Sequence, residues 1–187
     1  MHSEIVKILK NGGVGIMPTD TIYGLVGSAT SRKTVFRIYK LRKRNPRKPF
    51  IILIGSLKDL KLFKIKIDGF SREILSKIWP NAISVVLPCA RKKFFYLHRG
   101  NKTLAFRFPK NRILARFLRQ TGPLIAPSAN LEGLRPAENI EQAKEYFGEG
   151  VDFYVDKGTI KGLASTLIEI KNKKVFILRQ GAIKIKI

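Results

Sequence analysis

Val14-Gly15-Ile16-Met17-Pro18-Thr19-Asp20-Thr21-Ile22-Tyr23-Gly24-Leu25-Val26 joins two short apolar runs through a polar turn. Residues 14–17 predict a buried strand, and residues 23–26 predict a second strand that abuts it. The turn between them carries hydroxyl side chains, which an ordinary core element would lack. We therefore expect a sheet with polar side chains gathered at the ends of its strands.

Three further stretches share this character. Residues 40–48 contain six cations and no acid. Pro127-Ser128-Ala129-Asn130 and Ala164-Ser165-Thr166-Leu167 bring more hydroxyl and amide groups to expected strand ends. Cations and hydrogen-bond donors of this kind bind anions through charge-assisted hydrogen bonds. The four stretches together predict a site for a phosphorylated small molecule.

Apolar periodicity along the chain predicts that helices and strands interleave. Helices are expected at residues 4–10, 31–44, 56–63, 71–79, 112–120 and 139–147. Strands are expected at residues 14–17, 23–26, 50–54, 84–88, 103–108, 124–126, 153–155, 165–170 and 174–179. Adjacent strands late in the chain require some antiparallel pairing. We predict a single domain over residues 1–187, built on a twisted, open, mixed α/β sheet with flanking helices.

The composition is that of a folded, basic protein of the reducing cytoplasm. A single cysteine, Cys89, excludes a disulfide framework. No signal peptide is evident, and no apolar run approaches the ~18 residues that a membrane span needs. The 37 Lys and Arg residues against 13 Asp and Glu attract polyanions such as nucleic acid. A Lys- and Ile-rich source genome would account for much of this excess.

Several chemistries are excluded. Gly100-Asn101-Lys102-Thr103 lacks the upstream glycine of a phosphate-binding loop, and Gly12-Gly13-Val14-Gly15 precedes a strand instead of following one. His2 and His98 are too few for a histidine metal cage, and we expect His98 in a surface loop. Chemistry that depends on positioning and charge stabilisation remains, as in phosphoryl and nucleotidyl transfer, and Mg²⁺ is expected to arrive mostly on nucleotide phosphates.

Some side chains have two open interpretations. Arg42 follows Ile38 by four residues and so continues the apolar face of the expected 31–44 helix. It either meets a partner or ligand there, or extends along the surface at the helix end. Thr19 and Asp20 either organise the turn or contact a ligand. Tyr23 is either a pocket wall or a core residue.

The chain resembles the YrdC/TsaC-like threonylcarbamoyl-AMP synthases almost from end to end. Pro18 to Leu25 resembles the signature that opens this family, and Arg42-Lys43-Arg44 resembles its Lys-x-Arg motif, with arginine where lysine is usual. The remaining motifs follow in order as Trp79-Pro80-Asn81-Ala82-Ile83-Ser84, Arg107-Phe108-Pro109, Ser128-Ala129-Asn130, Ser165-Thr166 and Arg179-Gln180-Gly181.

The resemblance implies a fold and a reaction. The family has a twisted open α/β sheet around a large, basic, concave surface, and longer relatives carry a C-terminal domain, for which this chain is expected to be too short. The implied reaction converts ATP, L-threonine and bicarbonate into L-threonylcarbamoyladenylate and diphosphate. A partner complex then transfers the threonylcarbamoyl group to the adenosine beside the tRNA anticodon, and weak RNA binding by this chain is compatible with its charge.

In that reaction two anions approach each other, which requires fixed cations. Arg42 and Arg44 are the expected catalytic residues. The expected substrate and ATP contacts are Thr21, Tyr23, Lys48, Arg107, Ser128, Asn130, Ser165 and Arg179. The base that deprotonates the threonine amine stays open between Asp20, solvent and bicarbonate.

Two other functions compete. One is a non-catalytic RNA-binding module that keeps the fold and uses the +24 surface. The other is the carbamoyl-adenylating module of hydrogenase maturation, which normally accompanies Cys-rich zinc domains. One cysteine argues against the latter.

Overall fold

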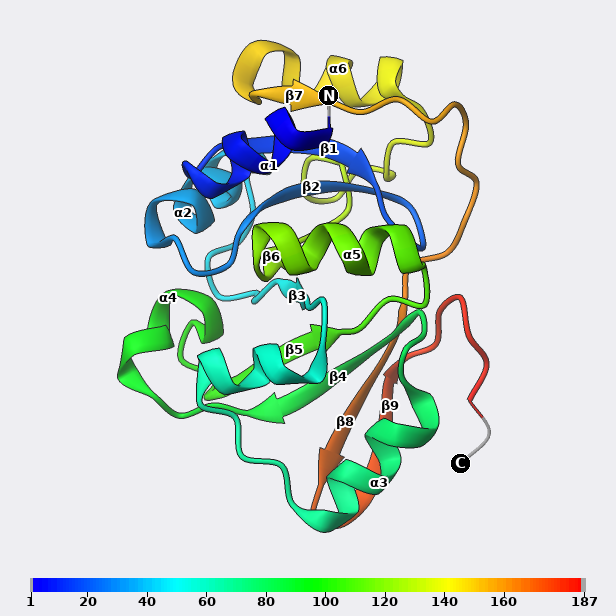
Figure 1. The fold of residues 1–187 in the computed structure, drawn as a ribbon. Coiled ribbons are helices and arrows are strands. Elements are labelled where there is room, and N and C mark those ends of the chain that lie inside the picture. The colour runs from blue at the N-terminus through cyan, green and yellow to red at the C-terminus, as the bar shows by residue number, and fades with distance from the viewer. Residues whose placement is uncertain (1, 186–187) are drawn as a thin grey trace.

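The computed structural model describes residues 2–185. Within these residues nine strands form one sheet, in the order β7-β1-β2-β6-β3-β5-β4-β8-β9 (Figure 1). The strands are β1 Val14–Pro18, β2 Tyr23–Ser28, β3 Ile51–Leu53, β4 Ile83–Pro88, β5 Thr103–Arg107, β6 Leu124–Ile125, β7 Phe153–Tyr154, β8 Thr166–Lys171 and β9 Lys174–Arg179. Three parallel pairs (β1–β7, β3–β5, β4–β8) occur among antiparallel pairs, which confirms the expected mixed sheet.

Helices cover the face of the sheet seen in Figure 1, where α1, α5 and α3 lie in front of the strands. The α-helices are α1 His2–Lys10, α2 Arg32–Leu41, α3 Gly69–Ile78, α4 Phe95–His98, α5 Arg112–Thr121 and α6 Ile140–Phe147. Short 3-10 helices are η1 Leu57–Phe63, η2 Lys92–Phe94 and η3 Gly148–Gly150. A polar side chain caps each of α2, α3, α5 and α6 by accepting a hydrogen bond from a backbone N–H of the first turn.

The apolar core lies in two clusters on the sheet. The smaller one joins α1 and α5 to the strands through Leu9, Val26, Leu53 and Leu118, all fully buried. The larger one holds most of the remaining core residues, including Phe50, Phe63, Phe94, Phe106 and Phe147. Because this burial fixes the strands, their carboxyl and amino ends provide a rigid frame for polar side chains.

The β1–β2 turn is organised by Thr19. Its Oγ1 accepts hydrogen bonds from Thr21 N and Ile22 N and donates one to Ile22 O at 2.6 Å. The Thr19 backbone N–H also donates to Ile22 O. This turn closes the register between Pro18 and Tyr23 and holds the intervening side chains at the strand ends.

The helix predicted at residues 31–44 is shorter than expected, because α2 ends at Leu41. The Arg44 N–H donates to Tyr39 O and the Lys43 N–H to Lys40 O. Together with the left-handed φ of +48° at Lys43, these bonds form a Schellman motif. The prediction was wrong because this motif normally contains glycine, and lysine gives no such signal.

The prediction for His98 also needs correction. His98 is buried, 3% exposed, and not in a surface loop. The reason is that residues 92–98 form η2 and α4, whose buried Phe94 and Leu97 carry His98 inward. Its Nδ1 accepts a hydrogen bond from Gly100 N. The helical pattern expected at 56–63 is confirmed and takes the form of the 3-10 helix η1.

No helix in the described part of the chain is long and apolar enough to cross a membrane. The prediction of a single domain over residues 1–187 stays a prediction.

Candidate active site

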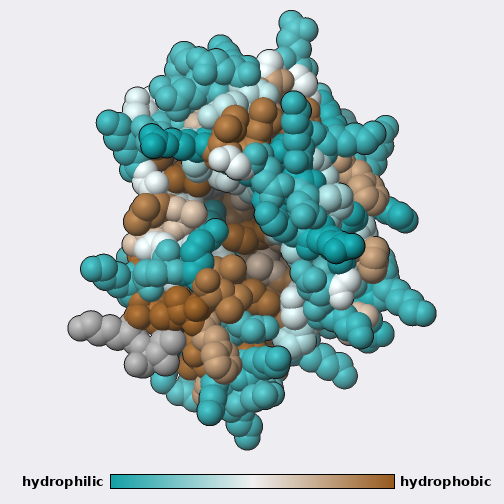
Figure 2. Space-filling model, turned by 180° about the vertical axis from the view of Figure 1, so that it is seen from behind, coloured by the Kyte–Doolittle hydropathy of each residue, from teal (hydrophilic) through white to brown (hydrophobic). Residues whose placement is uncertain are grey.

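A cleft of about 480 Å³ opens on the face of the sheet opposite the one seen in Figure 1. Figure 2 shows this face hollowed at its centre, with apolar side chains gathered beside the hollow and hydrophilic ones around it. The volume is in the range of small-molecule sites. All four sequence stretches singled out above contribute to the lining, which includes Thr19, Thr21, Tyr23, Arg42, Arg44, Arg107, Ser128, Ser165 and Arg179.

Arg42 lies at the end of α2 and is buried, 3% exposed. Its Nε donates to Asn130 O and its Nη2 to Asn130 Oδ1, both at 2.9 Å. Nη2 also lies 3.4 Å from Ser128 Oγ. The partner that the buried Arg42 side chain requires is therefore the Ser128–Asn130 turn.

Arg44 reaches the same cleft because the helix stops before it. In a continuing helix, residues two apart point in different directions. The Schellman turn instead lets both Arg42 and Arg44 line the cleft. Arg44 donates from Nε to Lys48 O and from Nη2 to Pro49 O, and its guanidinium lies 5.1 Å from the Phe50 ring centre.

Asn130 is a positioning residue in this arrangement. It accepts from Arg42 and from Ser128 Oγ through Oδ1, and donates through Nδ2 to Leu131 O and Leu134 O. Its amide is thereby saturated, and the residue does not line the cleft. Ser128 does line it, with its hydroxyl held at 2.6 Å from Asn130 Oδ1.

Lys48 is placed away from the cleft lining. Its Nζ forms an ion pair with Glu132 Oε1 at 2.7 Å, and the Glu132 Oε2 accepts from Asn45 N. The Glu132 N–H in turn donates to Arg42 O. Glu132 thus ties the basic 43–48 loop to the Ser128–Asn130 turn, a role that sequence reasoning missed because 84 residues separate the two partners.

Arg107 stands at the end of β5, buried, with its Nη2 2.9 Å from Asp20 Oδ1. The Asp20 side chain, 6% exposed, comes from the β1–β2 turn. The prediction for Asp20 left turn and ligand contact open, and the structure shows an ion pair. No sequence signal joins these two residues before the fold is known.

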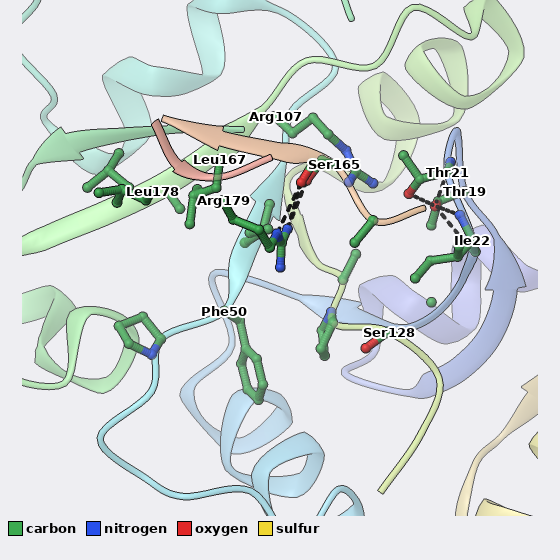
Figure 3. A pocket seen from close by; sticks show the side chains of 18 of the residues that line it. Thr19, Thr21, Ile22, Phe50, Arg107, Ser128, Ser165, Leu167, Leu178 and Arg179 are labelled. Atoms are coloured by element: carbon green, nitrogen blue, oxygen red, sulfur yellow. Dashed lines mark hydrogen bonds between the residues drawn. The ribbon is translucent and has the colours of Figure 1, made fainter. Parts of the chain in front are cut away.

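Ser165 and Arg179 meet beside Arg107 (Figure 3). Arg179 donates from Nε and Nη2 to Ser165 O, and Ser165 Oγ lies 2.8 Å from Ser84 Oγ. A side chain at Gly181 would collide with the Ala164 carbonyl, so the Arg179-Gln180-Gly181 segment needs glycine to hold Arg179 here. Ser84, the last residue of the 79–84 motif, was not predicted to support the site.

Tyr23 is both cleft wall and core. It is fully buried and lines the cleft, while its hydroxyl donates to Gly158 O and accepts from Lys157 N. Burial is the main cause that raises the Tyr23 pKa. Thr21 lines the cleft with its hydroxyl 3.1 Å from that of Thr19.

Burial lowers the pKa of the four cleft arginines, but they stay protonated at neutral pH. Burial, followed by the nearby charge of Arg44, lowers the pKa of Arg42 to about 10, while Glu132 acts in the opposite direction. Burial also lowers the pKa of Arg107, which Asp20 raises and Arg179 lowers further. Burial likewise lowers the pKa of Arg44 and of Arg179. The cleft is therefore strongly cationic at neutral pH.

Among residues 2–185, no group of three or more His, Cys, Asp or Glu side chains is placed to hold a metal ion. The chemistry that this cleft can support is the binding and alignment of anions between fixed guanidinium groups and hydroxyls.

Known proteins resemble this chain in sequence and in fold. The Sua5/YciO/YrdC family model, described as "Telomere recombination", matches residues 7–181. A threonylcarbamoyl-AMP synthase of Pseudoalteromonas translucida is 30% identical over 91% of this chain and 94% of its own length. One of Bacillus subtilis is 27% identical over 97% of this chain and 53% of its own length.

A solved structure, Pyrococcus abyssi Sua5 complexed with L-threonine, superposes with a TM-score of 0.88 at 26% identity. The match covers 96% of this chain and 54% of that protein. The chain thus spans about half the length of the Bacillus and Pyrococcus relatives. Family model, relatives and structure agree, and the chain belongs to the Sua5/YciO/YrdC family.

Proposed function

We propose that this protein is a nucleotidyltransferase that forms L-threonylcarbamoyladenylate and diphosphate from ATP, L-threonine and bicarbonate. The observation that carries the proposal is the convergence of Arg42, Arg44, Arg107 and Arg179 on one cleft with the hydroxyls of Ser128 and Ser165. The names of the relatives and the threonine-bound Sua5 support the same substrates.

The chemistry matches what the cleft offers. Bicarbonate loses hydroxide to give CO₂, and the threonine amine adds to this CO₂ and gives its proton to the hydroxide, which yields a carbamate and water. A carbamate oxygen then attacks the α-phosphorus of ATP. A bond forms between the carbamate oxygen and the α-phosphorus, the bond from the α-phosphorus to the bridging oxygen breaks, and diphosphate leaves. Fixed cations lower the repulsion between the two anions, and they need no reorganisation during the reaction.

The proposed roles of the side chains differ according to where each lies in the cleft. We propose that Arg42 and Arg44, with the Ser128 hydroxyl, bind the phosphates, and that Asn130 aligns Arg42 for that purpose. Thr21, Tyr23, Ser165, Arg107 and Arg179 would enclose threonine and the adenylate. Lys48 would contribute only after leaving Glu132.

The proposal also includes what uses the product and the compartment in which this happens. A tRNA threonylcarbamoyl-transfer complex would take the adenylate in the cytoplasm, where a single buried cysteine stays reduced. Mg²⁺ would enter bound to ATP, and most of its remaining ligands would be water molecules.

Diphosphate release tests the proposal. Incubation with ATP, threonine and bicarbonate should release diphosphate, and omission of threonine should stop it. Release that is absent, or that is equal without threonine, would contradict the proposal. Salt-sensitive RNA binding without turnover would instead favour the RNA-binding module. Thermal shifts with ATP, threonine and both together would show which ligands bind the native state.

A further inference from the structure

A chain of cation–aromatic contacts connects Arg99 to Arg44. The Arg99 guanidinium carbon lies 5.0 Å from the ring centre of Tyr39, and the Tyr39 and Phe50 rings pack with 4.2 Å between their centres. The Phe50 ring centre lies 5.1 Å from the Arg44 guanidinium carbon. Phe50 and Arg44 line the cleft, whereas Arg99 does not (Figure 3). The four residues Arg99, Tyr39, Phe50 and Arg44 (the aromatic bridge) therefore join a segment outside the cleft to a cleft arginine.

The aromatic bridge also holds the basic 43–48 loop by its carbonyl groups. Arg99 Nε donates to Pro46 O at 2.6 Å, and the Tyr39 hydroxyl donates to Lys48 O at 2.9 Å. The loop lies in no helix or strand, so no regular backbone ladder fixes its course. Its position, and that of the cleft arginine it carries, depends on contacts of this kind.

Burial strengthens the contacts within the bridge. Tyr39 is 6% exposed and Phe50 is 4% exposed. An arginine over an aromatic ring gains more when the pair is shielded from water. Burial is the main cause that raises the Tyr39 pKa, and the charges of Arg99 and Arg44 lower it. Both arginines therefore act on the same buried ring.

The backbone of Arg99 allows its side chain to be removed cleanly. Arg99 is the C-cap residue of α4, with a left-handed φ of +53°. Its backbone N–H donates to Phe95 O, and this bond does not involve the side chain. Glycine adopts such an angle more readily than any other residue. Arg99→Gly therefore deletes the bridge contact without straining the turn.

We infer that Arg99 is a positioning residue, which holds Tyr39 and the basic loop so that the Arg44 guanidinium points into the cleft. The inference rests on the proposed function, in which Arg44 binds the phosphates of ATP. Arg99 acts from outside the cleft, through Tyr39 and through the Pro46 carbonyl. It belongs to none of the sequence motifs described above, so no local pattern assigns it this role.

Steady-state kinetics of Arg99→Gly test the inference. The variant loses one hydrogen bond and one cation–aromatic contact, so its ATP KM should rise roughly fivefold. The threonine KM should stay within about twofold, because Arg99 acts only on the loop proposed to bind phosphate. In an Arg44→Ala background, Arg99→Gly should change the ATP KM no further, since Arg99 acts through Arg44.

Two variants separate positioning from charge. Lys64→Gly is the matched control, because Lys64 is an exposed cation at another left-handed C-cap, outside the cleft lining, and its loss should leave the ATP KM unchanged. Arg99→Lys keeps the charge without the planar guanidinium and should recover at most part of the loss. Full recovery in Arg99→Lys would mean that charge alone attracts ATP, and it would overturn the inference.

An unchanged ATP KM in folded Arg99→Gly, or additive effects in the double variant, would also overturn the inference. If Arg99→Gly fails to fold, Tyr39→Phe keeps the ring and removes the hydroxyl bond to Lys48 O, and it should still raise the ATP KM. Wild-type protein without threonine-dependent turnover would overturn the proposed function instead. Calorimetric ATP binding to the same variants would then decide the inference separately.

Discussion

Arg42 is held by the neutral acceptors of Asn130, whereas Arg107 is held by the carboxylate of Asp20. The first group, Arg42, Arg44, Ser128 and Asn130 (the Arg42 cluster), therefore keeps two full positive charges. The second group, Asp20, Arg107, Ser165 and Arg179 (the Arg107 cluster), keeps one net positive charge. Figure 3 shows Ser128 of the first cluster across the cleft from Ser165 and Arg179 of the second. We propose on this ground that the two clusters bind ligands of different charge, a polyphosphate and a monoanion.

Removal of Arg44 from the Arg42 cluster should have the largest effect on turnover. Arg44→Ala should lower the kcat for diphosphate release by roughly 100-fold or more, because an aligned donor to developing charge is lost. Thermal melting should show that the variant is folded. Arg47→Ala, which removes a charge from the same loop outside the cleft lining, is the matched control and should be nearly normal. Near-normal turnover in Arg44→Ala would mean that the phosphates bind elsewhere.

The salt dependence of the ATP and threonine KM values should distinguish the two clusters in the wild-type protein. Salt screens charges beyond a Debye length of about 10 Å at 0.1 M, and the effect grows with the charges involved. The ATP KM should therefore rise several-fold with added salt, and the threonine KM should rise much less. In Asp20→Asn the threonine KM should become more salt-sensitive, because the Arg107 cluster then carries two charges. Equal salt dependence of both KM values would contradict the comparison.

Glu132 offers a smaller test in the opposite direction. Its charge acts on Arg42 and Arg44 and its carboxylate holds Lys48. Glu132→Gln should lower the ATP KM about two- to threefold by increasing the positive charge of the Arg42 cluster. Glu138→Gln, which removes an exposed acid from the same region, should have no effect. A raised ATP KM would show that the tie positions the 43–48 loop more than it opposes phosphate binding.

The same tie gives the smallest expected effect, a pH dependence of stability. The Lys48 side chain and the Asn45 N–H lower the pKa of Glu132 below its ordinary 4.5. Because the folded-state pKa is depressed, the stabilisation is present above pH 4.5 and is lost as the pH falls through the lowered pKa. The difference in melting temperature between wild type and Glu132→Gln should therefore vanish on acidification. A difference that persists below the lowered pKa would rule out an ionic tie.

Much of this arrangement could be predicted from local sequence. Apolar runs such as residues 50–54 and 84–88 predict strands because a short run of consecutive apolar side chains is typical of a buried strand. The cleft hydroxyls and arginines could be named because each stands in a short motif. The Asp20–Arg107 and Lys48–Glu132 pairs could not, since they form only when distant strands and loops meet. The placement of Lys48 away from the cleft lining is a consequence of that second pair.

Lys43 shows how much of the site depends on one backbone angle. Its left-handed φ of +48° ends α2 and turns Arg44 into the cleft that Arg42 also lines. If residue 43 were helical, Arg44 would point about 200° away from Arg42 around the helix axis. Glycine or asparagine at this spacer should preserve the geometry at lower conformational cost, whereas valine or isoleucine should not be tolerated there. Evolution at position 43 is therefore restricted by the backbone turn that this residue must form, although the residue itself does not line the cleft.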